Sequence, residues 1–246
     1  MTIYTYDGTF EGFLTALATA WERGEKPVEI TRTPLLQRGL FSELVDIETA
    51  PERALGFFDD IAVKISPFAC RTLYHAFLSD AAGMEMDLFR YLELGWRVGR
   101  RFDSLLTREE VLPVHRLARK VVHETHRMKG FVRFKQTREG FYYAQLEPDH
   151  RILPLIAPHF SERFSDQNWI IHDIRRGEAI IHDAARKKWV PVEMDLCGTP
   201  EFTAKERLCQ ELWKRYFDRI AIEERKNPRL QGSKLPLKYR KHLVEV

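Results

Sequence analysis

The 246-residue sequence has little of what marks secreted, membrane-spanning or disulfide-bonded proteins. Its three cysteines, Cys70, Cys197 and Cys209, are widely spaced, so they predict neither a disulfide framework nor a CxxC metal knuckle. No apolar run approaches the ~18–20 residues of a membrane span. The first ten residues have neither the basic stretch nor the apolar segment of a secretory signal. We therefore expect no membrane partner and a reducing, cytoplasmic location.

Charge of neither sign dominates, because the formal net charge is only +3. Its distribution is uneven, however. Residues 1–90 hold 8 Lys/Arg against 14 Asp/Glu, a net of −6, whereas residues 91–246 hold 31 against 22, a net of +9. Hydrophobic residues at 44% and charged residues at 30% are typical of a globular chain. The basic second part favours a polyanionic partner, although a solvated basic face is the simpler alternative.

Local patterns predict the fold of the first half. Residues 2–6 favour a strand, Asp7-Gly8 a turn, and Thr9 an N-cap, after which residues 10–21 are apolar at helical spacing. Gly24 ends this helix, and residues 27–32 predict a second strand, which completes a β-α-β unit. Residues 50–128 are predicted to be mostly helical. A helix over residues 107–128 carries an exposed cationic stripe at Arg116, Arg119, Lys120, His123 and Arg127.

The hydrophobic period changes after Gly130, which we expect to end that helix. Residues 131–135 and 141–146 predict a β-hairpin, residues 152–164 a helix, and residues 169–174 and 179–182 two facing arms that contain the two IIHD tetrapeptides. Residues 188–194 predict a further strand. Residues 203–224 predict a long amphipathic helix with inward apolar side chains at Leu208, Leu212, Trp213, Tyr216, Phe217 and Ile220.

The predicted fold class is α+β. An N-terminal β-α-β unit and a helical region occupy residues 1–128, and an antiparallel sheet with packed helices and a basic C-terminal segment occupies residues 129–246. These two parts are expected as two domains or as one continuous domain.

Four motifs resemble, in the same order, a bacterial family of probable DNA metabolism proteins, a domain of unknown function. They are Tyr6-Asp7-Gly8-x-Phe10-x-Gly12; His126-Arg127-x-Lys129-Gly130-Phe131-x-Arg133-Phe134; His159-Phe160-x-x-Arg163-Phe164-x-x-Gln167-x-Trp169-x-Ile171-x-Asp173-x-x-Arg176; and Trp213-Lys214-x-Tyr216-Phe217, followed by Arg225-x-Asn227 and Pro236-x-x-Tyr239. Arg240 departs from the pattern, in which an aromatic residue often follows the motif tyrosine. The resemblance implies that the protein acts together with a radical SAM protein in DNA modification or repair. In some proteins of this family, the domain is fused to a uracil-DNA-glycosylase-like domain. The resemblance supplies no catalytic residues and no cofactor, and the chain lacks the CxxxCxxC signature of a radical SAM enzyme.

The first functional hypothesis is a nucleic-acid-binding accessory protein. Residues 115–140 hold eight Lys/Arg and two acidic residues, interleaved with aromatics that unpaired bases need for stacking. DNA, single-stranded or as a distorted duplex, is the expected partner beside the radical SAM protein. The basic segment 225–241 is expected to bind either DNA or the radical SAM protein. The predicted contacts are Arg116, Arg119, Lys120, Arg127, Lys129, Arg133 and Tyr142.

An enzyme acting on a nucleotide or damaged base is the alternative hypothesis. An Arg/His/Asp pocket suits an anionic substrate, whereas the structural alternative is that the same charges pair and brace the helix–hairpin junction. The candidates are His126, His159, Arg163, Asp173 and Arg176. A metal site is not predicted: His123 and His126 are spaced i,i+3, but no HExxH motif or cysteine pair accompanies them.

Overall fold

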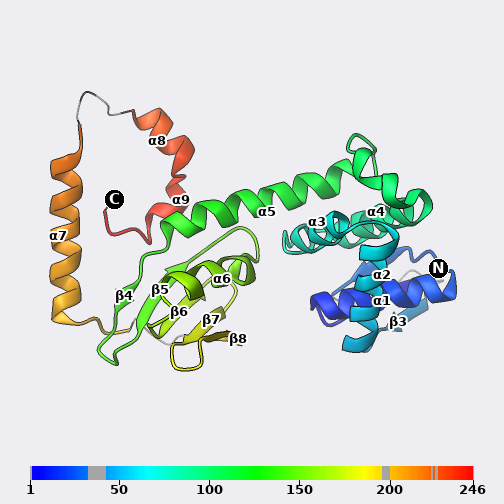
Figure 1. Cartoon of the computed structure of the whole chain (residues 1–246), viewed down its shortest axis with the longest axis horizontal. Coiled ribbons are helices and arrows are strands. Elements are labelled where there is room, and N and C mark those ends of the chain that lie inside the picture. The colour runs from blue at the N-terminus through cyan, green and yellow to red at the C-terminus, as the bar shows by residue number, and fades with distance from the viewer. Residues whose placement is uncertain (1, 33–42, 196–199, 223, 225–226, 246) are drawn as a thin grey trace. The chain divides into compact units, whose positions relative to one another are not determined.

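The computed structural model describes residues 2–32, 43–195, 200–222, 224 and 227–245. Cys197 and residues 225–226 of the basic C-terminal segment lie outside these ranges. The chain divides into two compact units, residues 1–122 and 123–246 (Figure 1). The α+β class is confirmed. The division into domains at residue 128 stays a prediction.

The first unit begins with the predicted β-α-β unit. Strand β1 (Thr2–Thr5), helix α1 (Phe10–Arg23) and strand β2 (Glu29–Thr31) follow one another, and β1 pairs in parallel with β2. Thr9 is the N-cap and accepts a hydrogen bond from the Gly12 amide, while Gly24 ends the helix in the left-handed conformation. Strand β3 (Glu43–Asp46), which sequence reasoning missed, pairs in parallel on the other side of β1. The parallel sheet therefore has the order β2-β1-β3.

The part of this unit that follows β3 is mostly helical, as predicted for residues 50–128. Its helices are α2 (Pro51–Lys64), α3 (Pro67–Phe77), α4 (Met84–Val98), the short 3₁₀ helix η1 (Gly99–Ser104) and α5 (Leu112–Phe131), which continues into the second unit. The predicted start of α5 at residue 107 is five residues early. Aromatic side chains join α1 to the other helices: Phe13 stacks on Phe77 with ring centroids 5.5 Å apart, and Trp21 lies 4.8 Å from Trp96.

Gly12, in the first turn of α1, lies close to the side chains of Asp7 and Thr49. A Cβ atom at Gly12 would overlap the Asp7 carboxylate and lie 2.7 Å from Thr49 Oγ1. That carboxylate already accepts hydrogen bonds from Thr9 and Thr49. We expect Gly12→Ala to lower the free energy of unfolding by about 1–3 kcal/mol, as overpacking does, in a urea titration. The control is Gly56→Ala on α2, where nothing lies within 4 Å; it should raise stability by about 0.5–1 kcal/mol. Equal shifts would contradict the packing argument.

The second unit is built on a five-stranded sheet with the order β4-β5-β6-β7-β8. Its strands are β4 (Lys135–Gln136), β5 (Tyr142–Leu146), β6 (Trp169–Asp173), β7 (Glu178–Asp183) and β8 (Lys188–Glu193). The IIHD tetrapeptides face each other as predicted, with Ile170 opposite Ile181 and Ile171 opposite Ile180. Helix α6 (Leu153–Arg163) connects β5 to β6 and packs against β7 and β8 (Figure 1).

Three details of the predicted second unit are corrected. The sheet is mixed, because β5 and β6 are parallel, as the crossover through α6 requires. Gly130 does not end α5, which continues to Phe131, so the hairpin arm predicted at residues 131–135 shrinks to β4. All six apolar side chains expected to point inward from helix α7 (Ala204–Ile220) are 37 to 55% exposed. Periodicity identifies side chains that share a face, but not what covers that face.

The chain ends with two short helices, α8 (Pro228–Lys234) and α9 (Leu237–Arg240). Tyr239 of α9 is buried, and its hydroxyl donates a hydrogen bond of 2.5 Å to Glu124 Oε1 on α5. The other carboxylate oxygen of Glu124 accepts from the His150 amide at 2.9 Å, and Oε1 also accepts from the Asp149 amide at 2.8 Å. One buried carboxylate thus joins α5, the loop before α6 and the C-terminal segment.

Candidate functional site

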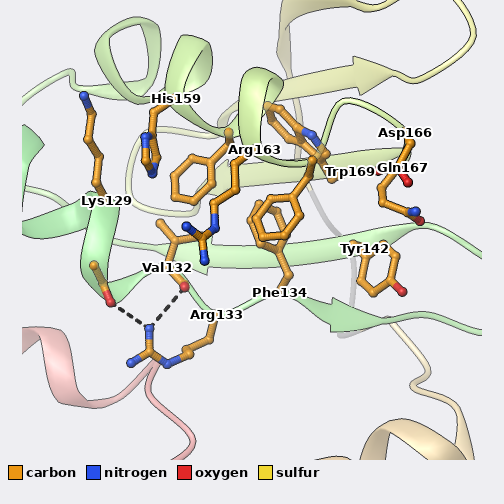
Figure 2. A pocket seen from close by; sticks show the side chains of 13 residues that line it. Lys129, Val132, Arg133, Phe134, Tyr142, His159, Arg163, Asp166, Gln167 and Trp169 are labelled. Atoms are coloured by element: carbon orange, nitrogen blue, oxygen red, sulfur yellow. Dashed lines mark hydrogen bonds between the residues drawn. The ribbon is translucent and has the colours of Figure 1, made fainter.

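A cavity of about 740 Å³ opens in the second unit (Figure 2). Its walls come from the end of α5 and the segment before β4, from β5, from α6, and from the loop between α6 and β6. The lining residues are Lys129, Gly130, Val132, Arg133, Phe134, Tyr142, His159, Phe160, Arg163, Phe164, Asp166, Gln167 and Trp169. All belong to residues 123–246. The volume lies within the range that suits a small organic ligand, about 300–1,000 Å³.

Aromatic rings form the apolar wall of this cavity. Phe134 meets Phe160 and Phe164 edge to face, each with ring centroids 5.4 Å apart. Phe134 also lies 5.9 Å from Trp169. Trp169 is only 1% exposed and stacks on His182 at 4.9 Å with nearly parallel planes. Phe160 is also buried, at 3% exposed, whereas Phe134 and Phe164 are half-buried. The wall is therefore preorganised, and a flat aromatic ligand could stack on the Phe134 and Phe164 rings without rearranging the core.

Two cationic side chains and a histidine lie at one end of the cavity. Lys129 from α5 and His159 and Arg163 from α6 lie on the same side in Figure 2. Lys129 and Arg163 are exposed, and neither forms an ion pair within the described residues. The Arg163 guanidinium lies 5.7 Å from the centroid of the Phe164 ring. Two unpaired cations beside an aromatic wall are available to an anionic ligand.

Arg133 lines the same cavity, but its guanidinium is already engaged. It donates to Glu245 Oε1 at 2.5 Å and to Glu245 Oε2 at 3.3 Å, and its Nη1 donates to the carbonyls of Gly130 and Val132 (Figure 2). Burial by itself would raise the pKa of Glu245, but the Arg133 pair outweighs burial and holds that pKa below its ordinary value. Arg133 therefore attaches the C-terminal segment to the end of α5.

The opposite end of the cavity is polar without being cationic. Asp166 and Gln167 in the α6–β6 loop lie near Tyr142 of β5 in Figure 2, across the cavity from Lys129 and His159. The backbone of this loop is held in place. The Tyr142 amide donates to the Asn168 carbonyl at 2.9 Å, and the Gln167 carbonyl lies 2.9 Å from His182 Nδ1. The Asp166 side chain is exposed and has no hydrogen bond or ion pair within the described residues.

The predicted nucleic-acid contacts are divided by the structure. Lys129, Arg133 and Tyr142 line the cavity. The other four, Arg116, Arg119, Lys120 and Arg127, are exposed on α5 and do not line it. Two aromatics interleaved with these cations, Phe131 and Phe134, are half-buried. Phe134 joins the cavity wall, and the Phe131 ring centroid lies 6.0 Å from that of Tyr239.

The predicted catalytic candidates do not gather in one place. His159 and Arg163 line the cavity, whereas His126 is exposed on α5 outside it. Asp173 and Arg176 are not lining residues either. Asp173 is fully buried and pairs with Arg176 Nη1 at 2.9 Å. The Arg176 guanidinium also donates to the carbonyls of Pro148 and Asp149. This pair therefore braces the β6–β7 turn against the loop before α6.

Sequence reasoning did not select Phe160, Phe164, Asp166, Gln167 and Trp169 as site residues. A signal for four of them was present in the third motif. His159, Phe160, Arg163, Phe164, Gln167 and Trp169 all line the cavity. Four of these six occur at i, i+1, i+4 and i+5, which places three of them on one face of α6 and the fourth, Phe164, at its C-cap. Helical spacing of mixed aromatic and cationic residues was therefore the informative feature.

The comparison with family models gives one match. The model of a domain of unknown function, DUF4130, matches residues 82–245. The chain belongs to this family. The DUF4130 segment contains every cavity-lining residue. No curated protein and no solved structure matches the chain.

Two further features to consider are metal-binding groups and membrane-spanning helices. Among the described residues, no group of three or more His, Cys, Asp or Glu side chains is placed to hold a metal ion. In the same part of the chain, no helix is both long and apolar enough to cross a bilayer.

Proposed function

We propose that this DUF4130 protein binds single-stranded or locally unpaired DNA, with one nucleobase against the aromatic wall and neighbouring phosphates on Lys129 and Arg163. The observation that carries the proposal is the cavity itself, in which exposed, unpaired cations adjoin a ready-made aromatic surface. Unpaired bases are bound by stacking on aromatic rings, while cations neutralise the backbone. A base stacked inside a duplex would first have to be flipped out at a cost.

The biological setting of the proposal comes from the resemblance described above. We propose an accessory role in DNA repair or modification, beside a radical SAM protein that performs the chemistry. Within the same unit as the cavity, the exposed cation Arg127 on α5 supplies further charge for phosphates, whereas Arg116, Arg119 and Lys120 belong to the first unit. An enzyme with an Arg/His/Asp pocket has less support, because Asp173 and Arg176 are paired with each other outside the cavity.

The test is fluorescence anisotropy of a labelled single-stranded oligonucleotide across a salt series. We expect Lys129→Ala/Arg163→Ala to weaken binding about tenfold or more at low salt. Because each phosphate contact on a single strand contributes about −0.7 to the slope of log K against log salt, the slope should become shallower by about 1.4. Duplex DNA of the same sequence should bind more weakly, since its bases are stacked.

A matched control removes the same charge elsewhere. Arg175 and Lys188 are exposed cations of the same unit that do not line the cavity. Arg175→Ala/Lys188→Ala should leave the salt slope unchanged. If both double variants weaken binding equally, the surface charge as a whole is responsible and the cavity is not the site. Absence of salt-sensitive binding would exclude the proposal altogether.

A further inference from the structure

The two ends of the cavity carry different chemistry, and this difference gives a bound nucleotide a direction. Lys129 and Arg163 lie at the cationic end, and Asp166 and Gln167 lie at the other end (Figure 2). A phosphate is attracted to the cationic end and repelled by the Asp166 carboxylate. A nucleotide stacked on the aromatic wall would therefore point the edge of its base toward Asp166 and Gln167.

We infer that the cavity selects guanine. This inference rests on the proposed function and specifies its ligand. An ionised carboxylate accepts hydrogen bonds and donates none, so Asp166 favours a base edge with adjacent donors. Guanine presents N1–H and the N2 amino group side by side, which matches the two oxygens of one carboxylate in a bidentate pair. Its O6 atom is an acceptor for the Gln167 amide group or the Tyr142 hydroxyl.

The other bases fit this end of the cavity less well. Adenine and cytosine each place a ring-nitrogen acceptor beside their amino group, and that acceptor would face a carboxylate oxygen. Thymine offers a single N–H between two carbonyl acceptors, so only one carboxylate oxygen would find a donor. A bidentate pair discriminates between bases by about five- to 150-fold. Asp166 can make such a pair because no described residue engages its carboxylate.

Backbone hydrogen bonds hold the loop that carries Asp166 and Gln167 in place. The Gln167 amide donates to the Phe164 carbonyl at 3.2 Å, at the end of α6. On the other side, the Asn168 carbonyl accepts the Tyr142 amide, next to the start of β6. The loop that carries Asp166 and Gln167 is therefore anchored at both ends to elements that also form the cavity wall.

The experiment compares single-stranded oligo(dT) that carries one central dG, dA, dC or deoxyinosine, with plain oligo(dT), by anisotropy at one salt concentration. We expect the dG oligonucleotide to bind about tenfold more tightly than the others. Deoxyinosine, which keeps N1–H and O6 but lacks the N2 amino group, should lose most of this preference. Asp166→Asn should abolish the preference for dG, because the amide replaces one acceptor with a donor.

Glu162→Gln is the matched control. Glu162 is an exposed acid on α6 that does not line the cavity, and its substitution removes the same charge. It should keep the dG preference that Asp166→Asn abolishes. Salt-sensitive binding of all oligonucleotides with equal affinity would overturn the inference and leave the proposed function standing. Preference for dG that survives Asp166→Asn would also overturn it. Absence of binding to every oligonucleotide would overturn both.

Discussion

Replacing Asp173 by alanine is expected to lower the free energy of unfolding by about 3–5 kcal/mol, because it removes one partner of a buried ion pair. The Asp173 side chain is 1% exposed and that of Arg176 is 10% exposed. The carboxylate also accepts hydrogen bonds from the amides of Arg175 and Arg176. Its loss leaves a guanidinium with little access to water and the Arg175 amide without its acceptor, while the Arg176 amide keeps its bond to the Asp173 carbonyl. A urea titration followed by tryptophan fluorescence measures the change.

The second IIHD tetrapeptide provides the control for this prediction. Asp183 ends β7 as Asp173 ends β6, and it likewise pairs with an arginine three residues later. The side chains of Asp183 and Arg186 are 44% and 82% exposed, however. Asp183→Ala should therefore lower the free energy of unfolding by only about 1 kcal/mol. Most of this loss comes from the hydrogen bonds that the Asp183 carboxylate accepts from turn amides. If Asp173→Ala and Asp183→Ala lowered the free energy of unfolding by similar amounts, burial would not determine the strength of the Asp173–Arg176 ion pair.

This comparison also bears on how a loss of function at Asp173 should be interpreted. The sequence makes Asp173 a candidate catalytic residue. In the structure it holds a turn, so a variant that loses activity or binding through unfolding reveals nothing about chemistry. Only a measurement on the folded fraction can separate the two roles.

Much of the fold could be predicted because its signals are local. Thr9 and Gly24 mark the ends of α1, and short apolar runs mark the facing arms β6 and β7. Errors arose where two neighbouring signals compete. Phe131 was predicted to begin a strand, but it completes the last turn of α5 instead. The parallel pairing of β5 with β6 depends on a helical crossover, which period-two alternation does not register.

The candidate site was only partly predictable, for a different reason. Cationic and aromatic residue types pointed to the α5–β5 region, and Lys129, Arg133 and Tyr142 do line the cavity. The sequence could not show that Arg133 is held by Glu245, more than a hundred residues away. It also could not separate Arg163, which is free to bind an anion, from Arg176, which is committed to a buried carboxylate. Such assignments depend on tertiary contacts between distant segments.

The buried carboxylate of Glu124 is the second position at which we expect a large effect. Glu124 is 5% exposed and accepts three hydrogen bonds, from the Asp149 and His150 amides and the Tyr239 hydroxyl. Glu124→Ala leaves two amides and a phenol without an acceptor, which should lower the free energy of unfolding by about 3 kcal/mol. Tyr239→Phe removes only one of the three bonds and should cost about 1 kcal/mol. Denaturant unfolding of the two variants measures both values.

Glu162→Ala, at an exposed position on α6, should change stability by no more than about 0.5 kcal/mol. If Glu124→Ala changed the free energy of unfolding by as little as this, water would be replacing Glu124 as the acceptor of the three hydrogen bonds. Because Glu124 does not line the cavity, the folded fraction of the Glu124 variant should still bind oligonucleotide through Lys129 and Arg163. Stability and binding are therefore expected to respond to different residues of the same unit, and this separation allows the cavity to be tested by substitution without unfolding the protein.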